Sequence, residues 1–215
     1  MKKLITTLLI LSSLMMFTSC ATKPTDASVS PAATQSTTDQ KEAKEKMEEI
    51  FQKKCSADEA LELAKRSDVV VFEDVGCTFG QEVWDAFYKS VSDGLPAAVL
   101  CANYYTLDGQ NMSEELYEQE KDNYPVLYFT LLEYDGKEFS IQVRDSSSDK
   151  LDRRETFKYL NHYTGDAPAT AIYKHYEYYV LVDDADTTWE QIEQGNFSSQ
   201  YGDMIRHSTV YTNYT

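Results

Sequence analysis

The chain has 215 residues, of which 36 are Asp or Glu and 20 are Lys or Arg, so its formal net charge is −16. Such an acidic surface repels nucleic acid, and we therefore exclude a nucleic-acid partner. The length suits one folded domain of ordinary size.

The first residues have the pattern of a secretory signal. Two lysines precede an apolar run over residues 4–17, which is shorter than the about 20 residues that a membrane-spanning helix needs. The string "FTSC" that follows resembles the lipobox, in which a cysteine is lipidated and becomes the new N-terminus. We expect residues 1–19 to be a lipoprotein signal peptide and Cys20 to anchor the chain outside the cytoplasm, on the cell membrane. The alternative is ordinary signal cleavage after Ala21.

The next segment has a different composition. Residues 20–40 contain no aromatic residue and are rich in Ser, Thr, Ala and Pro. Such a segment cannot bury enough apolar surface to order itself, so we expect a disordered tether. Residues 41–215 are then expected to form a single folded domain.

Within that domain, helical patterns come first and strand patterns later. We expect helices over residues 41–54, 56–67, 80–94, 113–121 and 187–195. We expect strands over residues 68–73, 96–107, 155–165, 169–184 and 203–214, with a hairpin over 124–145. This order predicts an α+β fold with one mainly antiparallel sheet packed by the N-terminal helices.

The hairpin has the clearest turn signal in the chain. The Asp-Gly pair at 135–136 lies between two strand patterns, which predicts a type I′ turn. The first strand is apolar on both faces and is expected to be central. Pairing from that turn places Glu133 opposite Glu138, and it places Arg144 on an exposed face.

Three cysteines follow Cys20, namely Cys55, Cys77 and Cys101. Their spacing fits no metal-binding pattern. A Cys77–Cys101 disulfide and free, buried thiols both remain open.

Catalytic motifs are missing from the sequence. It contains no Gly-rich phosphate loop, GxSxG, HExxH or CxxC pattern. His162, His175 and His207 all fall in expected strands. An extracytoplasmic hydrolase would need His175 or His207 to meet a carboxylate in one pocket.

An acidic run precedes the last expected helix. Asp183, Asp184 and Asp186 favour helix capping over cation binding, because the run lacks the glycine and the spacing of a calcium loop. They are weak metal candidates, and we expect no cofactor.

Tyrosine is unusually common, with 16 residues. One strand pattern concentrates aromatic side chains that would form a binding surface if exposed: Tyr173, His175, Tyr176, Tyr178 and Tyr179. A second candidate is the loop after the last helix, made of Phe197, Ser198, Ser199 and Gln200. Two interpretations remain open for both groups. The tyrosines can serve as strand formers with their hydroxyls at the wet rim and the loop as a turn satisfied by its own side chains, or these residues can contact a protein, peptide or glycan at the cell surface.

The strings "LEYDGKEFSIQVRD", "FKYLNHY", "YVLVDDADTTWEQIEQGNFSSQYGD" and "IRHSTVY" resemble uncharacterised lipoproteins of Gram-positive anaerobes, a family built on a domain of unknown function. The resemblance covers roughly residues 58–212 and implies no activity. We therefore expect a membrane-anchored binding or interaction module rather than an enzyme. The alternatives are the hydrolase and a structural envelope lipoprotein.

Overall fold

The structure is a computed structural model that describes residues 31–74, 76–167, 171–198, 200, 202 and 204–215. It confirms the α+β class, with a mainly antiparallel sheet packed by N-terminal helices. The strands form two sheets, however, where the sequence predicts one. The expected signal peptide and Cys20 lie outside the described residues.

The helices and strands follow one another along the whole described chain. The helices are α1 (Pro31–Gln52), α2 (Ala57–Lys65), α3 (Gln81–Ser92), α4 (Glu114–Glu120), the 3-10 turn η1 (Lys121–Asn123) and α5 (Trp189–Phe197). The strands are β1 (Val70–Glu73), β2 (Gly76–Phe79), β3 (Ala97–Tyr105), β4 (Val126–Tyr134), β5 (Phe139–Asp145), β6 (Arg153–Phe157), β7 (Tyr159–Asp166), β8 (His175–Val182) and β9 (His207–Tyr214).

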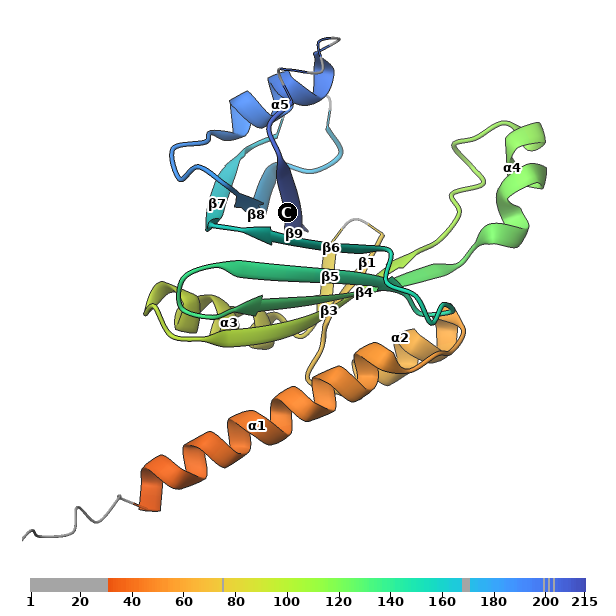
Figure 1. Ribbon diagram of the computed structural model, residues 1–215. Coiled ribbons are helices and arrows are strands. Elements are labelled where there is room, and N and C mark those ends of the chain that lie inside the picture. The colour runs from red at the N-terminus through yellow and green to blue at the C-terminus, as the bar shows by residue number, and fades with distance from the viewer. Residues whose placement is uncertain (1–30, 75, 168–170, 199, 201, 203) are drawn as a thin grey trace, which may run out of the picture.

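The larger sheet has the strand order β2-β1-β3-β4-β5-β6, and only its β1–β3 pair is parallel. The smaller sheet, β7-β8-β9, is antiparallel throughout. Lys158 alone separates β6 from β7, so one extended segment passes from the larger sheet to the smaller (Figure 1).

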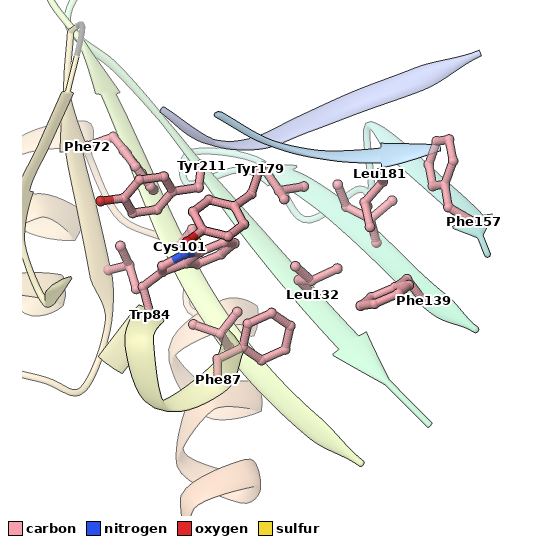
Figure 2. Packing of buried hydrophobic residues seen from close by; sticks show 14 residues of the cluster. Phe72, Trp84, Phe87, Cys101, Leu132, Phe139, Phe157, Tyr179, Leu181 and Tyr211 are labelled. Atoms are coloured by element: carbon pink, nitrogen blue, oxygen red, sulfur yellow. The ribbon is translucent and has the colours of Figure 1, made fainter. Parts of the chain in front are cut away.

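The central core lies between the two sheets and α3 (Figure 2). Trp84 and Phe87 of α3 point into it from one face of the helix, because residues three apart lie on the same side. The Trp84 ring stacks on Tyr211 with centroids 4.7 Å apart, and it meets Tyr179 edge-on at 5.1 Å. Leu132 contributes to the same cluster from the larger sheet. The cluster around Trp84 therefore joins α3 and the two sheets.

Two further clusters complete the layers. Ile50 and Phe51 of α1, together with Ala60 of α2, pack on the other face of the larger sheet against Phe129. Ile192 and its neighbours on α5 cover the outer face of the smaller sheet. Both faces of β4 are therefore buried, which confirms its central position.

The beginning of α1 differs from the expected tether. The helix starts at Pro31 rather than near Lys41, so residues 31–40 are helical. Proline suits the first position of a helix, and no later proline or glycine interrupts this segment through Gln52.

The β4–β5 hairpin is present, but its predicted register is wrong by two residues. Glu133 faces Ser140 rather than Glu138. The Asp135 carboxylate accepts hydrogen bonds from the backbone N–H groups of Lys137 and Glu138, at 2.8 and 2.9 Å, which holds a longer loop than a type I′ turn. Because side chains alternate with a period of two, the shift leaves every residue on its predicted face.

The expected exposure of Arg144 is also wrong. This side chain is only 2% exposed, because the end of α1 covers it. Its guanidinium donates hydrogen bonds to the backbone carbonyls of Phe51, Lys53 and Ser148.

Candidate functional site

A groove with a volume of about 880 Å³ lies at the end of the larger sheet where β3 begins and β4 ends. Both α1 and α3, which pack on opposite faces of this sheet, contribute to its wall. We call it the α1–α3 groove. Its apolar wall includes Met47, Ile50, Val83, Ala86, Phe87, Pro96, Ala97, Ala98, Tyr134 and Phe139.

Two helical stripes supply part of this wall. Met47 and Ile50 share one face of α1, and Val83 and Phe87 share one face of α3. Ile50 and Phe87 are buried in the cores, whereas Ala86 is exposed, so the wall runs from the interior out to solvent. The groove is thus continuous with the two hydrophobic cores that fix its shape.

The charged side chains around the groove are mostly acidic. Lys44 and Lys46 are the basic members, and the acidic members are Asp68, Glu82, Glu133, Asp135 and Glu138. We call this charged set the mouth of the groove. An acidic mouth on an apolar groove favours a ligand that carries positive charge beside its apolar groups.

One ion pair connects α1 to the sheet inside this charged set. The Lys44 ammonium lies 2.7 Å from the Glu133 carboxylate. The hydrogen bond to Glu133 raises the pKa of Lys44 above its usual value. Glu133 therefore has a cation as its partner, and the like-charge contact expected with Glu138 does not form.

The aromatic strand does not form one exposed surface. Tyr178 and Tyr179 are only 8% and 7% exposed. Tyr178 packs under Trp189 of α5, and Tyr179 lies in the central core. Burial raises the pKa of both hydroxyls well above the usual value for tyrosine.

The remaining members of that strand lie nearer to solvent. Tyr176 is half-buried and stacks on Tyr178. Tyr173 is also half-buried and packs on Tyr214 with centroids 4.2 Å apart. His175 is exposed at the start of β8. The structure thus brings these residues together mainly as packing.

The loop candidate begins at the end of α5. Phe197 is 90% exposed there. Ser198 caps the helix, and its hydroxyl accepts a hydrogen bond from the Gln200 backbone N–H at 3.1 Å. Ser199 lies outside the described residues. Ser198 therefore has a structural role in the turn.

The three histidines all lie in the smaller sheet, but each has a different partner. His162 Nε2 lies 2.8 Å from the Glu177 carboxylate. His175 Nδ1 lies 2.7 Å from Asp166. His207 Nδ1 lies 2.8 Å from a backbone carbonyl oxygen. His207 is paired with the last residue of β8, whereas His175 is the first residue of that strand. These rings do not meet in one pocket, and none of them lines the α1–α3 groove.

The acidic run before α5 is also divided among structural contacts. Asp183 forms an ion pair with Arg206 at 2.6 Å, and Asp184 accepts a hydrogen bond from the Asp186 backbone N–H at 3.0 Å. Among the described residues, no three His, Cys, Asp or Glu side chains are grouped so that they could hold a metal ion.

Sequence reasoning missed the α1–α3 groove, although its parts were visible. The apolar stripes over 41–54 and 80–94 predict two amphipathic helices. Nothing local indicates that both helices meet at the same end of the sheet, because that depends on tertiary packing. The acidic residues around the groove likewise come from three separate segments, namely Asp68, Glu82 and the hairpin at 133–138.

Comparison with known proteins adds no family to this geometry. No protein-family model, curated protein or solved structure matches the chain. The resemblance to a lipoprotein family therefore stays a prediction. Within the described residues, no helix is both long and apolar enough to span a membrane.

Proposed function

We propose that this chain is an extracytoplasmic lipoprotein, anchored to the cell membrane at Cys20, that binds a partner through the α1–α3 groove. The groove itself carries the proposal. Ligand sites are usually concave and mainly apolar, with a few polar groups and volumes of about 300–1,000 Å³. The α1–α3 groove has these properties, at about 880 Å³.

The proposed location is supported by the N-terminal pattern of an apolar run that ends at Cys20. Each methylene buried in the membrane contributes about 0.8 kcal/mol, so two or three acyl chains on one cysteine hold a protein there stably. The intact mass of the chain from its host membrane fraction tests this. We expect a lipid-sized increment that a Cys20→Ala variant lacks, whereas an unmodified chain beginning at Thr22 would overturn the anchor.

Binding in the groove is tested separately, with an uncharged fluorescent dye such as N-phenyl-1-naphthylamine. The Cys20→Ala full chain is used, because it carries no lipid that would compete for an apolar site. We expect the dye to bind with increased fluorescence and to be displaced when the groove is filled.

Ala86→Trp is the variant that fills the groove, since Ala86 is exposed on its wall and lies outside the buried cores. Ser92→Trp is the matched control, because Ser92 is exposed on the same helix but does not line the groove. Loss of dye binding in the first variant alone supports the site. Equal binding in both variants contradicts it, and no dye binding at all favours a structural envelope role.

A further inference from the structure

This inference rests on the proposed function and names the class of partner. We infer that the α1–α3 groove takes an amphipathic helix of a partner protein, with apolar residues in the groove and Lys or Arg along its mouth.

The size of the groove matches a short piece of helix. An α-helix with its side chains is about 10 Å across and rises about 1.5 Å per residue, so about 880 Å³ corresponds to roughly two turns. Two turns present apolar anchors at positions i, i+3, i+4 and i+7, which is the usual pattern of a helix in a hydrophobic groove.

The mouth of the groove selects for positive charge. Lys44 already neutralises Glu133 at 2.7 Å. Among the ion pairs between described residues, none includes Asp68, Glu82 or Glu138. Three carboxylates of the mouth are therefore left to pair with an incoming cation.

The same charges disfavour the other apolar occupants. A fatty acid or phospholipid would bring a carboxylate or phosphate toward this acidic mouth, where like charges repel. A second copy of this chain, with a net charge of −16, is repelled for the same reason. A basic helix combines the apolar surface that the groove buries with the charge that its mouth attracts.

The test uses two synthetic peptides of about 14 residues, enough for nearly four helical turns. Both carry Leu at the same four anchor positions, and their polar positions are Lys in one peptide and Glu in the other. Binding to the Cys20→Ala full chain is measured by fluorescence anisotropy at two salt concentrations. We expect the Lys peptide to bind at least about tenfold more tightly, to displace the dye and to weaken as salt rises.

The contribution of the mouth is tested with the double variant Glu82→Gln/Glu138→Gln. Since exposed ion pairs contribute about 0.2–1 kcal/mol each, we expect the Lys peptide to bind about fivefold more weakly, with dye binding unchanged. The double variant Glu190→Gln/Glu193→Gln on α5 removes the same charge outside the groove and should leave peptide binding unchanged.

The outcomes separate this inference from the proposed function. If neither the dye nor a peptide binds, the groove is not a ligand site and both fail. If the dye binds but the Lys and Glu peptides bind equally, the inference is overturned while the proposed function stands. If a fatty acid or an anionic phospholipid displaces the dye better than the Lys peptide does, the occupant is a lipid and the inference is also overturned.

Discussion

Arg144 on β5 donates a 2.6 Å hydrogen bond from Nε to the backbone carbonyl of Phe51, at the end of α1. The last carbonyls of a helix have no partner within the helix, and they carry the negative end of its dipole. The guanidinium also lies over the Phe51 ring, with Cζ 5.5 Å from its centroid. One buried cation therefore fixes the end of α1 on the larger sheet.

Replacement of Arg144 by methionine is expected to lower the free energy of unfolding by about 3 kcal/mol, because several carbonyls lose their buried donor. Arg144→Lys should recover only part of this loss, since one ammonium cannot reproduce the planar set of donors. Urea denaturation of the three proteins measures the effect. An unchanged midpoint in Arg144→Met would show that water satisfies those carbonyls equally well.

Arg144 also shows where sequence reasoning stops. Its place on the face opposite the apolar residues of β5 follows from alternation along the strand. The cover that buries it comes from the end of α1, more than ninety positions away in the chain, and no local pattern indicates that contact. The local sequence pattern of an arginine on a polar strand face is the same whether solvent or the end of a helix covers that face.

The hairpin shows the complementary case. The turn signal correctly predicts two antiparallel strands. The alternation of side chains, which puts Leu132 and Thr130 on the same face, correctly predicts the face of each residue. The register depends on whether the Asp135 carboxylate accepts from the backbone, and composition does not settle that detail. The fold class was therefore predictable from patterns, whereas the groove and its charges depend on contacts between distant segments.

Gly80 is predicted to be irreplaceable in the turn before α3. Its φ is +78°, and an added Cβ would overlap the Val69 backbone carbonyl. Gly80→Ala should lower the free energy of unfolding by about 3 kcal/mol, combining left-handed strain with a clash against buried backbone. Thermal unfolding followed by circular dichroism measures this change.

Gly94 provides the control for that prediction. It has a similar φ of +71°, but an added Cβ would meet nothing within 4 Å. Gly94→Ala should therefore cost only about 1 kcal/mol, the backbone contribution alone. If the two variants lose the same stability, contact with Val69 has no part in the effect.

Cys101 is predicted to stay reduced and unreactive in the folded protein. It is 1% exposed, and burial raises the pKa of its thiol well above the usual value. A bridge to Cys77 is excluded by topology, since β2 and β3 flank β1 on opposite sides. Their Cα atoms are then about 10 Å apart, beyond the reach of a disulfide.

Iodoacetamide labelling followed by peptide mass spectrometry tests this. Cys55 and Cys77 are half-buried, so both should react slowly while Cys101 remains unmodified until denaturant is added. A peptide pair joined through Cys77 and Cys101 in the native protein would contradict the strand order.

Glu73 is predicted to make stability depend on pH at the edge where β1 meets β2. Its carboxylate accepts hydrogen bonds from Lys65 at 2.8 Å and from the Thr78 hydroxyl at 2.7 Å, and these lower its pKa below 4.5. As the pH falls, the Glu73 carboxylate is therefore protonated at a higher pH in the unfolded chain than in the folded protein. The stabilisation is therefore present above about pH 4.5 and is lost as pH falls through the lower, folded pKa.

Glu73→Gln should consequently lower the free energy of unfolding by about 0.5–1 kcal/mol at pH 7, because the ion pair is partly exposed. The difference from the native chain should shrink as the pH falls through the folded pKa of Glu73, because the native carboxylate then becomes protonated as well. Urea denaturation at pH 7 and at successively lower pH values measures it, with Glu62→Gln as a control that removes the exposed ion pair between Glu62 on α2 and Arg66 just after it. A difference that stays constant as the pH falls to the acid limit of the folded protein would show that Glu73 acts through its shape and hydrogen bonds rather than through its charge.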